Sequence, residues 1–214
     1  MQLSGPSIIP TMSTSAVILL HGYGANGSDL IPIGEALSAE FSQTAFFAPN
    51  APTEIFSQGY EWFSLNDYNP QQLTLDYLNV LQKRAMYQVD LVKNYILNVV
   101  ETCHIPLDKI IIGGFSQGGL MAFLTAYSMS EKCAGVMGLS AVPLVHPVPY
   151  CFSTSVLLTH GGLDSVVPPI AMNISKETLE KMNQPVQTFC SKRMEHNIDN
   201  TCLEQIRLFL KKQF

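Results

Sequence analysis

The first 82 residues of this chain contain no lysine or arginine, and the first basic side chain is Lys83. Acidic residues in the same stretch are Asp29, Glu35, Glu40, Glu54, Glu61, Asp67 and Asp76. The formal net charge of the whole chain is −5 at pH 7. An acidic field repels phosphate backbones and anionic lipid surfaces. We therefore expect no nucleic-acid partner and no binding to anionic membranes.

Cysteines are few, odd in number and scattered: Cys103, Cys133, Cys151, Cys190 and Cys202. No pair has CxxC spacing, so we expect no metal site and no cofactor. Cysteine usage of this kind is typical of a reducing compartment, which predicts a cytoplasmic protein. Long apolar runs are also missing: residues 16–20 are too few to span a bilayer, and no basic segment precedes them. We expect no stable membrane insertion.

Length and segment order predict the architecture. A chain of 214 residues can bury about 70% of its unfolded surface around one core, so we expect a single domain over residues 1–214. Apolar runs alternate with segments of helical periodicity, which predicts an α/β protein with a mostly parallel sheet and helices on both faces. The expected helices are residues 30–41, 84–101, 117–130, 170–182 and 199–212.

Residues 54–81 form a long stretch between the expected elements. They include Tyr60, Trp62 and Phe63, whose rings are costly to leave in water. We interpret the stretch as a partial flap over the site, and an ordinary surface excursion with a short helix is the alternative.

The segment Gly114-Phe-Ser-Gln-Gly118 is the most informative in the chain, because it follows the apolar run 110–112 and precedes a helical segment. This context is typical of a nucleophile elbow, in which a tight turn exposes a serine hydroxyl at the sheet edge. Glycines at both ends remove side chains that would collide in such a turn. The sequence therefore predicts Ser116 as a nucleophile, and a plain glycine-rich turn is the alternative.

An elbow requires an acid and then a base further along the chain. Asp164 follows the strand-like run 155–159, and His196 follows the run 186–190. Carboxyl ends of parallel strands meet at one sheet edge, where such proteins hold their sites. His196 would take the proton of Ser116 and return it to the leaving group, while Asp164 orients the imidazole.

The remaining histidines fit other roles. His104 ends a helical segment and His146 lies in a proline-rich loop, so both are interpreted as bystanders. His21 and His160 each precede a glycine at a strand end, where bracing a loop is the expected role. The aspartates that could replace Asp164 do not follow an apolar strand in the required order: Asp67, Asp108 and Asp199.

Attack on a carbonyl also requires donors for the developing oxyanion. The apolar run 15–20 ends in His21-Gly-Tyr-Gly24, a turn that can present the amide of Tyr23. The second expected donor is the amide of Gln117, directly after the nucleophile at a helix N-terminus. An ordinary turn that connects a strand to a helix is the alternative interpretation of the first turn.

The chain resembles the phospholipase/carboxylesterase family that includes the acyl-protein thioesterases, and its compact bacterial branch most closely. The matching blocks are Leu3-Ser-Gly-Pro6, Leu20-His-Gly-Tyr-Gly-Ala-Asn-Gly-Ser-Asp-Leu30, Ala48-Pro-Asn-Ala-Pro52, Glu61-Trp-Phe-Ser-Leu65, Gly114-Phe-Ser-Gln-Gly-Gly119 and His160-Gly-Gly-Leu-Asp-Ser-Val-Val-Pro168. The resemblance implies an α/β-hydrolase fold with little or no lid.

By the same resemblance, Ser116, Asp164 and His196 fall on the family's catalytic triad, and Tyr23 and Gln117 on its oxyanion donors. Trp62 and Phe63 fall on a pair beside the acyl-binding cleft. Glu195 is a departure, because members usually have a glycine before the catalytic histidine.

The predicted function is a serine hydrolase that cleaves carboxylic esters or thioesters through an acyl-enzyme on Ser116. Its partner would be a small ester or thioester substrate or an acylated protein, and a homodimer is left open. The alternative among enzymes is a lysophospholipase or long-chain acyl-protein thioesterase. The alternative of another class is a catalytically silent binding protein on the same fold.

Overall fold

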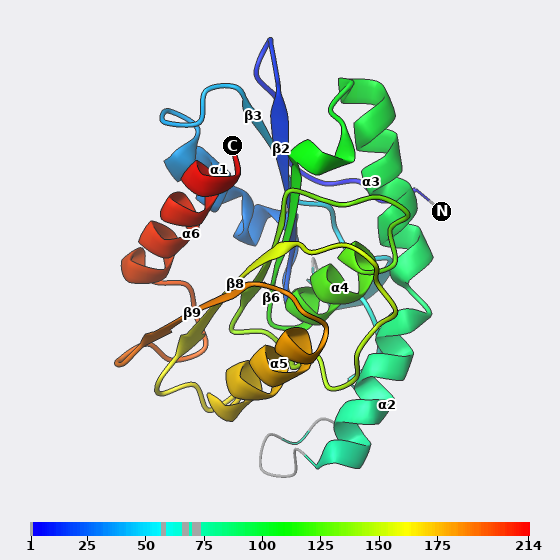
Figure 1. The fold of residues 1–214 in the computed structure, drawn as a ribbon, viewed down its shortest axis with the longest axis vertical. Helices are drawn as coiled ribbons and strands as arrows, with labels where there is room; N and C mark the ends of the chain where they lie inside the picture. Colours follow the sequence, from blue (N-terminus) through cyan, green and yellow to red (C-terminus); the bar gives the residue numbers. More distant parts are fainter. Residues whose placement is uncertain (1, 57–58, 66–68, 70–73) are drawn as a thin grey trace.

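The computed structural model describes residues 2–56, 59–65, 69 and 74–214. Within these residues a seven-stranded sheet forms the centre of the molecule, with the order β1-β3-β2-β6-β7-β8-β9 (Figure 1). The strands are β1 (Ser7–Ile8), β2 (Ser15–Leu20), β3 (Thr44–Phe47), β6 (Ile110–Phe115), β7 (Gly135–Leu139), β8 (Ser155–Gly161) and β9 (Val186–Ser191). Only β1 pairs antiparallel with its neighbour, so the prediction of a mostly parallel sheet is confirmed.

The helices are α1 (Ile31–Leu37), α2 (Leu75–Met86), α3 (Val89–Cys103), α4 (Gln117–Ala126), α5 (Ile170–Lys181) and α6 (Asn200–Gln213), with short 3₁₀ turns η1 (Gly27–Asp29) and η3 (Leu107–Lys109). α1 and α6 cover one face of the sheet, and α2 to α5 cover the other (Figure 1). All six residues of β2 are buried, as expected for a strand covered on both faces. Every predicted strand is found, and four of the five predicted ranges hold a single helix, although α1 and α4 end four residues earlier than predicted.

The exception is the helix predicted at residues 84–101. Two helices occupy this region, because α2 ends at Met86 and α3 starts at Val89. Leu78, Leu81 and Ala85 bury one face of α2, which begins inside the stretch interpreted as a flap. The sequence signal for its start is Thr74, whose side chain accepts a hydrogen bond from the Tyr77 N–H.

The rest of the stretch 54–81 is described only in part. β4 (Thr53–Phe56) and β5 (Gly59–Glu61) form a small antiparallel hairpin, and residues 57–58, 66–68 and 70–73 lie outside the described residues. The expectation that this stretch partly covers the site therefore stays a prediction.

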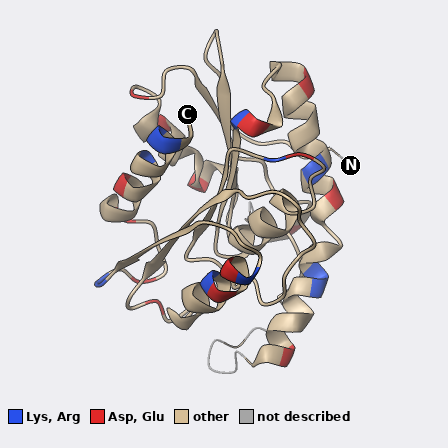
Figure 2. Cartoon of the chain, viewed as in Figure 1, with Lys and Arg blue, Asp and Glu red and all other residues tan. Residues whose placement is uncertain are grey.

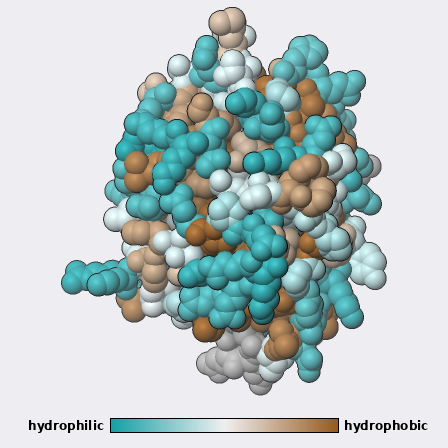
Figure 3. All heavy atoms as spheres, viewed as in Figure 1, coloured by the Kyte–Doolittle hydropathy of each residue, from teal (hydrophilic) through white to brown (hydrophobic). Residues whose placement is uncertain are grey.

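Charged residues lie mainly in the helices and the loops, while the strands of the central sheet are almost free of them (Figure 2). The face in Figure 3 is accordingly a mixture of hydrophilic residues and separate apolar spots. Among the described residues, no helix combines the length and the apolar character needed to cross a bilayer.

Candidate active site

The turn between β6 and α4 holds Ser116 in a strained backbone conformation. Its φ is 54° and its ψ is −116°, values that a residue with a side chain rarely adopts. A side chain at Gly118 would collide with the Leu20 carbonyl, and one at Gly114 with the Gly118 carbonyl. The two glycines therefore permit the close approach that this turn requires, as the sequence predicts for an elbow.

The turn after β2 lies directly over the serine. A side chain added at Gly22 would place its Cβ 3.3 Å from the Ser116 Cβ. Tyr23 follows, between two anchored residues: the Gly22 carbonyl accepts from His21, and the Gly24 N–H donates to the Tyr60 carbonyl at 2.9 Å. The Tyr23 amide is thus held in a defined turn beside Ser116.

His21 braces this turn, as the sequence predicts. Its Nδ1 lies 2.7 Å from the Gly22 carbonyl and must donate, and its Nε2 accepts from the Ala51 N–H at 2.9 Å. The ring is therefore neutral, with its proton on Nδ1. Burial lowers the pKa of His21, which favours the neutral form that this pair of bonds needs.

Trp62 and Gln117 join the turn to the elbow. Trp62 is fully buried, and its indole Nε1–H donates to the His21 carbonyl at 2.9 Å. The side chain of Gln117 accepts from the Trp62 N–H at 2.9 Å and donates to the Phe63 carbonyl at 2.6 Å. Trp62 and Phe63 both belong to the core cluster. Their position beside an acyl-binding cleft, which the resemblance implied, stays a prediction.

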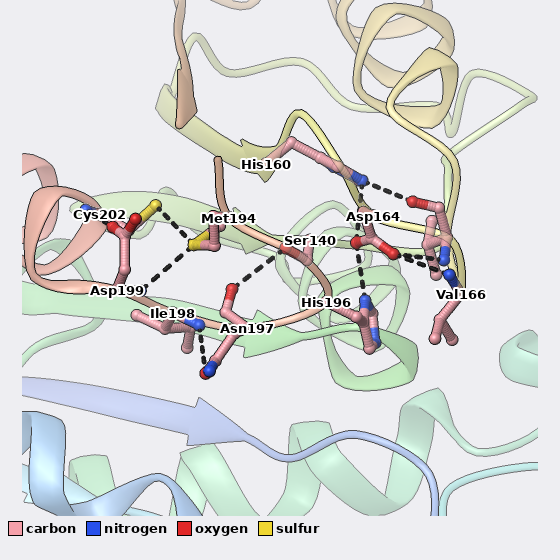
Figure 4. A network of polar contacts seen from close by, with 11 residues as sticks. Ser140, His160, Asp164, Val166, Met194, His196, Asn197, Ile198, Asp199 and Cys202 are labelled. Carbon is pink, nitrogen blue, oxygen red and sulfur yellow. Dashed lines mark hydrogen bonds and ion pairs between the residues drawn. The ribbon is translucent and has the colours of Figure 1, made fainter. Parts of the chain in front are cut away.

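Asp164 and His196 meet at the carboxyl ends of β8 and β9. The Asp164 Oδ2 accepts from His196 Nδ1 at 2.8 Å, and its Oδ1 accepts from the N–H groups of Val166 and Val167 (Figure 4). The Phe115 ring packs against the imidazole, with 4.6 Å between the ring centroids. Phe115 precedes Ser116, so this contact places the imidazole beside the elbow.

His160 is a further partner of the buried Asp164. Its Nε2 donates to the Val167 carbonyl at 2.8 Å and lies 3.4 Å from the Asp164 Oδ2. This is the loop-bracing role that the sequence predicts for His160.

The carboxyl of Asp164 is held in its charged form. Burial acts to raise the pKa of Asp164, but hydrogen bonds from His160 and His196, together with one from a backbone N–H, hold that pKa well below its ordinary range. A charged carboxylate on Nδ1 leaves the Nε2 of His196 as the nitrogen available for proton transfer.

The loop that carries His196 is anchored at several points. Leu163 donates its N–H to the Met194 carbonyl, which ties this loop to the one that carries Asp164. The Oγ of Ser140 donates to the Asn197 carbonyl at 3.3 Å (Figure 4). Ser140 directly follows β7 and has a φ of 44°. Sequence reasoning missed this anchor because β7, which places Ser140, was not among the predicted strands.

The other predicted residues have plain positions. Glu195 is exposed, and the described part of the chain shows no ion pair for it. His104 ends α3 in a left-handed conformation with a φ of 55°, and His146 is exposed. Asp199 caps α6 by accepting from the Cys202 N–H at 2.8 Å. None of these four observations brings a further group to Ser116.

Known proteins that are similar to this chain indicate its family. The profile of the phospholipase/carboxylesterase family matches residues 10–214. The acyl-protein thioesterase 1 of Gibberella zeae is 26% identical over 223 residues, which cover 97% of this chain and 95% of the relative.

Among solved structures, esterase PE8 matches with a TM-score of 0.89 and 28% identity, covering 100% of both chains. The Bacillus cereus carboxylesterase has a TM-score of 0.79 at 15% identity, covers 99% of this chain and 95% of its own, and shares the fold.

The sheet, its helices and the placement of the elbow define the class of the protein, which is an α/β-hydrolase. The chain belongs to the phospholipase/carboxylesterase family. As a member of that family it is a hydrolase of esters or thioesters.

Proposed function

We propose that this hydrolase works through an acyl-enzyme on Ser116, with His196 as the base and Asp164 as the residue that orients it. The observation that carries the proposal is the 2.8 Å hydrogen bond from His196 Nδ1 to the charged Asp164, beside a strained serine elbow. His196 takes the Ser116 proton during attack on the carbonyl and returns it to the leaving group. Asp164 stabilises the imidazolium that forms between these two steps.

Two backbone amides would receive the oxyanion in this proposal. Both polar atoms of the Gln117 side chain are bonded to Trp62 and Phe63, so its contribution is the backbone N–H at the start of α4. The Tyr23 N–H, in the turn over Ser116, is the second donor. One such donor typically lowers the barrier by about 3 kcal/mol. Trp62 then acts indirectly, by holding the turn through the His21 carbonyl.

The substrate would be an ester or thioester with an apolar acyl group. Exposed apolar side chains flank Asp164 along the chain: Leu163 precedes it, and Val166 and Ile170 follow it. Such side chains favour an acyl chain over a charged group. The same feature keeps a long-chain acyl thioester or lysophospholipid as the second candidate substrate.

We further propose that residues 1–214 act as one domain and that the protein works in the cytoplasm. All five cysteines are unpaired, which fits a reducing compartment.

Replacement of the nucleophile tests the proposal. Ser116→Ala should retain the fold and lose turnover of p-nitrophenyl esters, because the covalent route is gone while the glycines still form the turn. A fluorophosphonate probe should label the wild type stoichiometrically and leave this variant unlabelled. Labelling that persists in Ser116→Ala would place the nucleophile elsewhere, and a wild type that is neither labelled nor active would indicate a silent binding protein.

A further inference from the structure

A cavity of about 360 Å³ opens beside His196. One wall comes from Gly22, η1 and the start of α1, and the other from the loop after His196 and the start of α6. Figure 1 shows α1 and α6 on the same side of the sheet. The volume lies within the range of small-molecule sites.

The lining of the cavity combines apolar walls with two carboxylates. The apolar residues are Leu30, Pro32, Ile33, Phe115, Ile198 and Leu203. The carboxylates belong to Asp29 and Asp199, and no lysine or arginine is found among the described residues of the lining. Hydrogen bonds from neighbouring side chains and a backbone N–H hold the pKa of Asp199 at about 2 although burial acts to raise it, so Asp199 is charged at neutral pH.

The position of the cavity relative to His196 indicates which half of a substrate it can take. The Nδ1 of His196 is occupied by Asp164, so the proton for the leaving group must come from Nε2. The departing oxygen or sulfur atom must then lie within hydrogen-bond reach of this nitrogen. A substituent on that atom extends into the space beside His196, and the cavity is such a space.

The exposed apolar side chains that flank Asp164 are not part of this lining. Leu163, Val166 and Ile170 thus offer a separate apolar surface for the acyl half. The two halves of an ester would therefore meet two different environments, one beside His196 and one along the chain around Asp164.

We propose that the cavity receives the leaving group, and that it selects esters or thioesters whose alcohol or thiol carries an apolar substituent without phosphate or carboxylate. This inference rests on the proposed acyl-enzyme function. In acylation the bond from Ser116 Oγ to the acyl carbon forms as His196 takes the serine proton. The bond from carbon to oxygen or sulfur then breaks as His196 returns that proton, and the alcohol or thiol is left in the cavity.

Filling the cavity tests its role in size selection. Leu203→Trp and Pro32→Trp add an indole from opposite walls, and Leu208→Trp is the matched control because Leu208 is 40% exposed and further along the same helix. We expect both cavity variants to lower kcat/KM for 2-naphthyl acetate at least tenfold relative to that for ethyl acetate. A loss of about this size is typical when a pocket excludes one group of a substrate. The control should leave the ratio unchanged.

The rate of acyl-enzyme hydrolysis distinguishes a site for the leaving group from a site for the acyl group. The leaving group has departed before this step, so the deacylation rate constant should be unchanged in both cavity variants. Burst kinetics with p-nitrophenyl acetate measure it. If the loss of kcat/KM in the cavity variants grows with acyl length from acetate to octanoate, or if their deacylation rate is reduced, the cavity is an acyl site and the inference is overturned. If the ratio of kcat/KM for 2-naphthyl acetate to that for ethyl acetate is the same in all variants and the wild type, the cavity takes no part in catalysis.

The carboxylates are tested with a charged leaving group. We expect kcat/KM for 4-acetoxybenzoate to fall about tenfold below that for phenyl acetate at low salt, and Asp29→Asn to reduce this difference. The Asn retains an oxygen for the Asn26 N–H, to which Asp29 is bonded at 2.8 Å. A preference for the anionic ester would overturn the charge selection. Discrimination against this ester that Asp29→Asn does not alter would overturn it as well. If wild type hydrolyses none of these esters and fluorophosphonate fails to label Ser116, it is the proposed function that fails.

Discussion

At the residue scale, single polar atoms with one long-range partner hold the site together. The Trp62 indole is such a case, because its one donor reaches the His21 carbonyl, 41 residues away in sequence. The His21 ring in turn fixes Gly22 and accepts from Ala51. The side chains of His21 and Trp62 thus hold the turn that carries the Tyr23 amide.

Trp62→Phe should therefore weaken catalysis without regard to acyl length. The ring still fills most of the buried volume, but the His21 carbonyl loses its donor and the turn loses a constraint. A hydrogen bond of this kind is worth about 1 kcal/mol, which corresponds to a fall of roughly fivefold to tenfold in kcat/KM. The measurement is kcat/KM for p-nitrophenyl esters from acetyl to octanoyl, with acetyl as the internal reference. A loss that grows with chain length would instead support a direct contact between Trp62 and the acyl chain.

At the element scale, the loop between β9 and α6 is held from both ends. Ser140 at the end of β7 binds the Asn197 carbonyl, and Asp199 begins α6 as its N-cap. On the other side of His196, the Met194 carbonyl accepts from the Leu163 N–H. His196 thus lies between Met194 and Asn197, and its position depends on β7 and α6, which carry none of the proposed reacting atoms.

Ser140→Ala should lower kcat/KM about fivefold to tenfold with little change in melting temperature, because the lost bond holds His196 and not the core. Ser128→Ala is the matched control, since Ser128 Oγ donates to the Leu124 carbonyl at 2.7 Å at the end of α4. Steady-state kinetics and thermal unfolding of both variants decide the matter. Equal activity losses in the two would refute a positioning role for Ser140.

Asp199→Ala should destabilise the fold by about 1 kcal/mol at neutral pH, the usual cost of a lost N-cap. The pKa of Asp199 is about 2 in the folded protein and about 3.9 in an unfolded chain. A pKa that is lower in the folded state than in the unfolded state stabilises the fold at pH values above the unfolded-state pKa. This contribution is lost as the pH falls through the folded-state pKa.

The difference in melting temperature between wild type and Asp199→Ala should accordingly be full at pH 7 and pH 5 and should shrink between about pH 4 and pH 2. Thermal scans across this range measure it. Asp199→Asn serves as the control, because it keeps a capping oxygen but no titrating group. A difference that stays constant down to pH 2 would show that the charge of Asp199 contributes nothing.

At the scale of the whole molecule, one sheet separates two apolar clusters. α2 to α5 pack against one face, and α1 and α6 against the other. The strands that place Ser116, Asp164 and His196 are β6, β8 and β9. They run in the same direction, so their carboxyl ends lie at the same end of the sheet. The site therefore depends on the sheet as a unit.

If residues 1–214 are one domain, the chain should unfold in a single cooperative transition. Trp62 is the one tryptophan of the chain and lies in the cluster under α2 to α5, so its fluorescence reports on that face. Far-UV circular dichroism reports on all the helices. The two signals should change at the same denaturant concentration, and separate midpoints would indicate independently unfolding parts.

Local backbone chemistry made much of this protein predictable from its sequence. Gly114 and Gly118 are required by the elbow itself, and apolar runs such as residues 15–20 are sufficient to predict buried parallel strands. The order of Ser116, Asp164 and His196 followed from strand ends alone. Their placement was predicted because the chain direction of a parallel sheet brings such ends together.

Tertiary packing decided the rest. β7 contains two glycines, and Gly138 lies against the Phe123 ring, so the reason for its composition is a helix elsewhere in the chain. The burial of Trp62, the Ser140 anchor and the cavity beside His196 likewise join residues far apart in sequence. No local pattern encodes such contacts, because they form only when the helices settle on the two faces of the sheet.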